Sequence, residues 1–62
     1  MNKAEEKIFM QGYLSAVANL IYMFGVSVQA ESLFLEVSDS LKSISQYDID
    51  KHDMELISKL FK

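Results

Sequence analysis

The stretch that decides the fold is residues 2–27, NKAEEKIFMQGYLSAVANLIYMFGVS, which contains no proline. Asn2 is a good N-cap residue, and Glu5 three positions later completes a pair like that of a capping box. Gly25 stands where a left-handed residue commonly ends a helix. The stretch predicts a long helix over residues 3–24, then a tight turn. Its apolar residues recur at spacings of three and four and share one face: Phe9, Tyr13, Ala16, Val17, Leu20, Ile21 and Phe24.

Two further helices are predicted beyond the turn. Ser27 is an N-cap candidate for a second helix over residues 27–44, and Asp50 for a short third helix over residues 50–61. No run of strictly alternating residues predicts a strand. We therefore expect one all-α domain over residues 1–62, a helical hairpin of two long helices plus a short C-terminal helix.

The composition limits how such a domain is stabilised. The chain has 62 residues, of which 50% are hydrophobic, a formal net charge of −3 and no Cys. A chain this short buries only about 60% of the surface that its unfolded form exposes. Without Cys, disulfides and Cys-based zinc sites are excluded. We therefore expect good helix packing, self-association, or both.

The apolar surface exceeds what one helical hairpin buries. The apolar face of the first helix is about half a turn wide, and one antiparallel neighbour covers less than that. We expect two hairpins to pack as a four-helix-bundle-like homodimer. The predicted interface comprises Phe9, Tyr13, Leu20, Phe24, Leu33, Val37 and Leu41. Three apolar residues outside it form a predicted outer face for another protein: Ile8, Tyr22 and Leu35.

No constellation of residues predicts catalysis or a cofactor. The predicted function is non-enzymatic protein–protein interaction by a homo-oligomer, as a regulator, adaptor or inhibitor. Short acidic helical chains of this kind are common among the accessory proteins of phages and mobile elements. We expect the chain to be cytoplasmic, because Glu5 and Glu6 lie where a secretory signal has net positive charge. No membrane association is expected, since the most apolar stretch is shorter than the ~20 residues of a span.

The turn at residues 24–27 supports an alternative function, DNA binding by a transcription regulator of the helix-turn-helix type. Gly25 would be the turn glycine, and the following helix would present its first residues to the bases. The acidic residues of this helix and the absence of Arg from the chain make nucleic acid a disfavoured partner. The residues that would face the bases are Ser27, Val28, Gln29 and Ser32.

The densest set of potential metal ligands is Asp48, Asp50, His52 and Asp53. Carboxylates and an imidazole suit a divalent cation, but the Gly and the terminal Glu of a calcium loop are missing. Acidic residues at a helix N-terminus also cap amides and balance the helix dipole. We therefore expect no bound metal.

Overall fold

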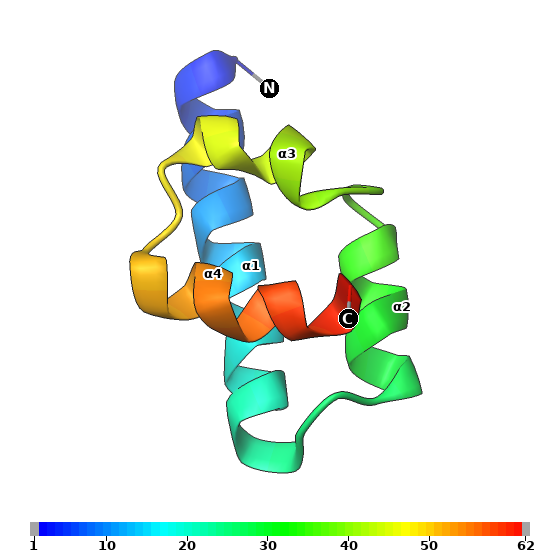
Figure 1. The fold of residues 1–62 in the computed structure, drawn as a ribbon. Coiled ribbons are helices and arrows are strands. Elements are labelled where there is room, and N and C mark those ends of the chain that lie inside the picture. The colour runs from blue at the N-terminus through cyan, green and yellow to red at the C-terminus, as the bar shows by residue number, and fades with distance from the viewer. Residues whose placement is uncertain (1, 62) are drawn as a thin grey trace.

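A computed structural model describes residues 2–61, and every regular element in that range is a helix (Figure 1). The prediction of an all-α fold is confirmed. The α-helices are α1 (Lys3–Phe24), α2 (Val28–Leu35), α3 (Leu41–Ile44) and α4 (Lys51–Ser58). Two short 3₁₀ helices follow α3 and α4, namely η1 (Ser45–Tyr47) and η2 (Lys59–Phe61).

The first helix begins and ends where the sequence predicts. The Asn2 side-chain oxygen accepts a hydrogen bond from the Glu5 N–H at 2.8 Å. At the other end, the Gly25 N–H donates to the Ile21 carbonyl at 2.7 Å. Gly25 has φ 77° and ψ −175°, so its φ is positive as expected, but its ψ is extended rather than helical. Only glycine adopts this region readily, and the chain turns there toward α2.

The second helix is much shorter than the predicted residues 27–44, and that prediction is wrong. Ser27 caps α2 as expected, but the helix ends after 8 residues at Leu35. In the next segment the Ser38 hydroxyl donates to the Ser40 carbonyl, and the Ser40 side chain caps α3. Serine side chains compete with a helix for backbone groups, which separates α2 from α3. The predicted hairpin of two long helices is therefore replaced by one long helix and several short ones.

The last helix packs within its own chain and crosses α1 (Figure 1). The Asp50 carboxylate caps it as predicted, accepting from the His52 N–H at 3.0 Å. Leu56 and Ile57 of α4 are buried in the core beside α1. α4 therefore covers a part of α1 that a second long helix was expected to cover.

The core face of α1 differs from the predicted face. Of the predicted set only Val17 and Ile21 are buried, and Phe9 and Phe24 are exposed. Consecutive residues on a helix are about 100° apart. With this spacing, the centre of the observed buried face lies about a quarter of a turn round α1 from the centre of the predicted face. It is centred on Leu14 and packs against Ala30, Phe34, Ile44, Leu56 and Ile57. Its own members are Met10, Leu14, Val17, Ala18 and Ile21.

Candidate functional site

The longest uncharged segment of the chain, residues 8–30, covers most of α1, the turn and the start of α2. Lys7 precedes it and Glu31 follows it. Seven of the ten exposed large hydrophobic side chains in the described range lie within it. A group of exposed apolar side chains is typical of an interaction surface. The seven residues are Ile8, Phe9, Tyr22, Met23, Phe24, Val26 and Val28.

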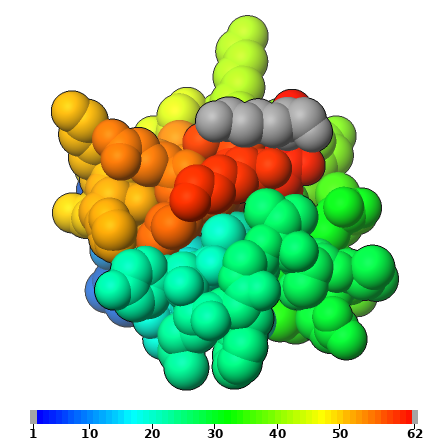
Figure 2. Space-filling model, turned by 60° about the horizontal axis from the view of Figure 1, so that its bottom comes forward, coloured from blue at the N-terminus to red at the C-terminus, as the bar shows by residue number. Residues whose placement is uncertain are grey.

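The most exposed of these side chains flank the turn between α1 and α2, at the last residue of α1 and the first residue of α2. Phe24 is 71% exposed and Val28 is 78% exposed, with the exposed Met23 and Val26 beside them. Figure 2 views this end of the molecule, where the cyan and green residues around the turn come forward below the orange and red residues of α4 and η2. Sequence reasoning did not assign Val26 or Val28 to a protein contact surface, and considered Val28 only as a residue that would face DNA bases. The absence of charge from residues 8–30 was the signal that could have found them.

The residues predicted to form the oligomer interface divide into two groups. Phe9, Phe24 and Leu33 are exposed, and Leu20 is half-buried. The other three pack against the core of their own chain, so they are no longer wholly free to contact a partner. These are Tyr13, Val37 and Leu41.

Three of the predicted interface residues lie together at the edge between α1 and α2. The ring centroids of Phe9 and Tyr13 are 5.8 Å apart. The Tyr13 hydroxyl donates to the Leu33 carbonyl at 2.6 Å, which ties α1 to α2 at this point. Phe9, Tyr13 and Leu33 therefore form one apolar edge that the two helices share.

The three residues predicted to form an outer face are exposed but have different surroundings. The Tyr22 ring lies beside the His52 ring of α4, with centroids 6.2 Å apart. Leu35 borders a small hollow with Leu60 and Phe61 at the end of the chain. Ile8 is exposed near the start of α1. The structure does not bring Tyr22 and Leu35 together in one hollow.

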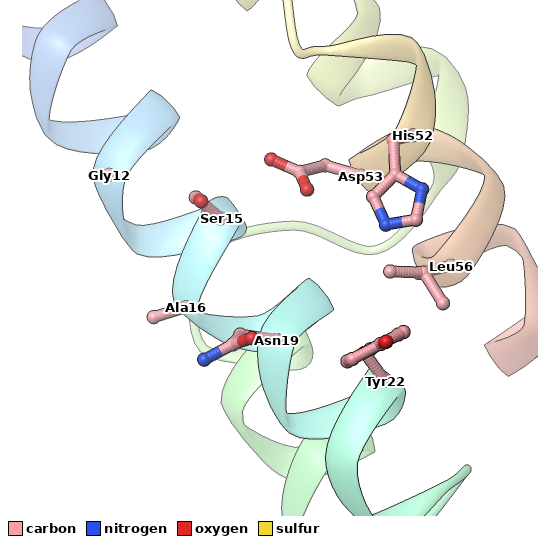
Figure 3. A pocket seen from close by; sticks show the side chains of 8 residues that line it. All are labelled: Gly12, Ser15, Ala16, Asn19, Tyr22, His52, Asp53 and Leu56. Atoms are coloured by element: carbon pink, nitrogen blue, oxygen red, sulfur yellow. The ribbon is translucent and has the colours of Figure 1, made fainter.

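An open cleft of about 470 Å³ lies between α1 and α4 (Figure 3). Ser15, His52 and Asp53 all line it, which places a hydroxyl, an imidazole and a carboxylate in one cleft. No hydrogen bond joins these three side chains, so the contact between nucleophile and base that covalent catalysis uses is not formed. The remaining lining residues are Gly12, Ala16, Asn19, Tyr22 and Leu56.

The acidic residues considered as metal ligands have partners within the chain. The Asp50 carboxylate caps α4, and the Asp48 carboxylate pairs with the Lys7 ammonium. Within residues 2–61, no three His, Asp or Glu side chains are grouped so that they could hold a metal ion. Capping and ion pairing account for Asp48 and Asp50.

A polar contact ties η1 to the first half of α1. The Tyr47 hydroxyl donates to the Glu6 carboxylate at 2.9 Å, and the Gln11 side chain donates to the Tyr47 carbonyl at 2.8 Å. The hydrogen bond to Glu6, with smaller contributions from desolvation and from the Glu6 charge, raises the pKa of Tyr47. Gln11 is a polar residue within the segment 8–30, and none of the seven exposed apolar side chains takes part in these hydrogen bonds.

Comparison with protein-family models, with curated proteins and with solved structures gave no match to this chain. In the part of the chain that the structure describes, none of the helices has the length and apolarity needed to cross a membrane.

Proposed function

We propose that this chain is a non-enzymatic protein–protein interaction module that acts as a homo-oligomer. The contact surface is formed by the exposed apolar side chains of α1, the turn and α2 other than Ile8, Tyr22 and Leu35. The observation that carries the proposal is the uncharged segment 8–30, with its seven exposed large hydrophobic side chains. As a regulator, adaptor or inhibitor, such a module works by occupying the surface of another molecule.

Two physical arguments support self-association. Covering apolar surface contributes about 25 cal/mol per Å², and the exposed side chains of the turn offer such surface without neighbouring charges in the sequence. A 62-residue chain also buries a smaller fraction of its surface than a larger domain, so a partner chain adds to its stability. The outer residues Ile8, Tyr22 and Leu35 then remain as candidates for contact with a different protein.

The test of this proposal is light scattering coupled to size exclusion over a wide range of protein concentrations. The monomer mass is 7.1 kDa, and we expect the measured mass to rise toward twice that value with concentration. A mass of 7.1 kDa at every concentration would contradict self-association.

DNA binding through the turn at Gly25 is kept as the second candidate, and the described surface of α2 does not favour it. Val28 and Leu35 expose apolar side chains on this helix, and Glu31 is an acidic residue in its first turn. Contacts with phosphates need a cationic surface. Duplex DNA binding at low salt that weakens steeply as salt is added would support this candidate, and no binding at low salt would end it.

A further inference from the structure

The first helix carries a second apolar stripe beside its core face, with the spacing of a helix-pairing seam. Phe9, Tyr13, Ala16, Leu20 and Met23 follow one another at spacings of four, three, four and three residues. This is the heptad spacing at which one helix packs against another. We name these five residues the α1 seam.

The α1 seam is open to solvent at its centre and at both ends. Phe9 is 49% exposed and Met23 is 60% exposed, and Ala16 is exposed between them. Tyr13 and Leu20 are half-buried. Consecutive residues on a helix are about 100° apart. Ala16 is two residues after Leu14, the centre of the core face, and therefore lies on nearly the opposite side of α1. The core of the monomer therefore leaves Phe9, Ala16 and Met23 exposed and covers Tyr13 and Leu20 only in part.

From this geometry, and resting on the proposed self-association, we infer that the α1 seams of two copies pack antiparallel about a two-fold axis at Ala16. In this arrangement Phe9 of one copy lies beside Met23 of the other, and Tyr13 lies near Leu20. The seam has its small residue at the centre and large residues toward both ends, so it complements itself when reversed. A two-fold interface requires this self-complementarity.

Charge indicates a second copy as the occupant of the seam. The chain has a net charge of −3, so two copies repel each other unless they meet through an uncharged surface. α1 has no charged residue after Lys7, and the seam begins at Phe9. A nucleic acid or another strongly charged partner would find no complementary charge along the seam.

The acidic start of α1 decides between the two orientations. Glu5 and Glu6 lie in the first turn of α1. A parallel pair would place these carboxylates beside those of the second copy, whereas an antiparallel pair separates them by most of the helix length. Antiparallel helices also place opposite ends of their dipoles side by side.

The available area indicates a weak dimer. A stable interface buries roughly 800 Å² on each partner. α1 has 22 residues, and a helix of that length measures about 33 Å by 10 Å. One side of α1 is therefore smaller than the area that a stable interface buries on each partner. The exposed Phe24 and Leu33 flank the seam and enlarge the contact. We expect the dissociation constant of the dimer to be in the micromolar range. The dimer then forms only at raised protein concentration.

Single-cysteine variants test the seam directly, because the chain has no Cys of its own. Ala16→Cys places a thiol at the two-fold axis, and Ser15→Cys places one on the neighbouring exposed position, about 100° further round the helix and off the seam. Each variant is oxidised with diamide at a concentration where light scattering reports dimers. Pairing raises the effective concentration of facing thiols, so Ala16→Cys should form the disulfide-linked dimer at least about tenfold faster than Ser15→Cys. Circular dichroism and thiol labelling in denaturant control for folding and reactivity.

A second pair of variants tests the orientation. Phe9→Cys and Met23→Cys should link mainly with each other when mixed, which mass spectrometry reads from the mass of the linked product. Self-linking of Phe9→Cys at the rate of the mixture would mean a parallel pair and would overturn the inference. Dimers by light scattering with no preferential linking at Ala16, Phe9 or Met23 would overturn the seam while leaving the proposed function standing. A monomer at every concentration would end both.

Discussion

The two apolar faces of α1 each have five residues, one of them Ala, but different environments. The core face, centred on Leu14, is covered by residues from α2, α3 and α4 of the same chain. The α1 seam, with Ala16 at its centre, has exposed apolar side chains at both ends. Apolar spacing therefore predicts that α1 is a helix, but it does not decide which part of a wide apolar arc is buried. That choice depends on where the other helices pack.

The largest expected contrast is between two phenylalanines, one in each environment. Phe34 is fully buried, with its ring 5.3 Å from the Phe61 ring, whereas Phe24 is 71% exposed. Phe34→Ala should lower the free energy of unfolding by about 3–5 kcal/mol, which is comparable to the whole stability of a domain this small. Phe24→Ala should change it by no more than about 0.5 kcal/mol. Urea unfolding followed by circular dichroism measures both.

The outcome for Phe24→Ala also separates stability from association. At low protein concentration the Phe24→Ala chain should have the same free energy of unfolding as the parent chain. At high concentration light scattering should report a smaller fraction of dimers for the variant than for the parent. A large loss of monomer stability in Phe24→Ala would mean that Phe24 is covered within its own chain, which would break the contrast between the two faces.

The parts of the fold that were predictable are those fixed by local chemistry. Asn2, Ser27 and Asp50 cap the helices that follow them, as expected from side chains that accept backbone N–H groups. The break after Leu35 was missed because an apolar stripe continues through Val37, Leu41 and Ile44. This periodicity predicts one continuous helix, in which Ser40 would be an interior residue and not an N-cap. The core face was missed because the crossing of α4 over α1 is a long-range contact, which periodicity does not encode.

The candidate site was predictable in composition but only partly in membership. An apolar surplus on a short chain indicated a contact surface, and Phe9, Phe24 and Leu33 are exposed. Val37 and Leu41 were assigned to the interface because they continued the stripe of a long helix that does not form. They pack on their own core instead.

The second prediction tests whether the exposed face of α1 pairs with itself. Ala16→Glu would place two carboxylates at the proposed two-fold axis, where like charges a few ångströms apart repel strongly. We expect dimerisation to weaken by at least about a hundredfold, with unchanged helix content. Sedimentation equilibrium measures the association constant.

Ser15→Glu is the matched control for Ala16→Glu. It adds the same charge one residue away, about 100° further round α1; both residues line the cleft with α4, but Ser15 is not part of the α1 seam. We expect a much smaller change in dimerisation for this variant. Equal weakening by the two substitutions would show that net charge, rather than the position at Ala16, governs association.

The third prediction compares the two glycines, Gly12 within α1 and Gly25 at its end. A Cβ at either position would meet nothing within 4 Å, so space does not distinguish them. Gly25→Ala should cost about 1–3 kcal/mol, because its φ of 77° lies in a region that alanine avoids. Gly12→Ala should instead add about 0.5–1 kcal/mol, since alanine is the better helix former.

The two glycine variants are best measured by urea unfolding in the Ala16→Glu background, which keeps the chain monomeric. Opposite signs for the same substitution are the expected result. A stability loss at Gly12 in this background would mean that α1 is approached closely by another part of its own chain, contrary to the exposed position of Gly12.

The smallest expected effect concerns the polar contact between Tyr47 of η1 and Glu6 in the first turn of α1. The Tyr47 hydroxyl donates to Glu6, which raises the pKa of Tyr47 above its ordinary value of about 10.

A group whose pKa is raised by folding stabilises the fold fully below its unfolded pKa, and this contribution is lost as pH rises through the folded pKa. The parent chain should therefore lose stability more steeply above about pH 10 than Tyr47→Phe does. Because the two proteins differ only at residue 47, the comparison of their thermal midpoints isolates the contribution of the Tyr47 hydroxyl. Equal alkaline slopes for the two proteins would show that the hydrogen bond to Glu6 adds nothing to stability, and that η1 is held to α1 by other contacts such as the Gln11 side chain.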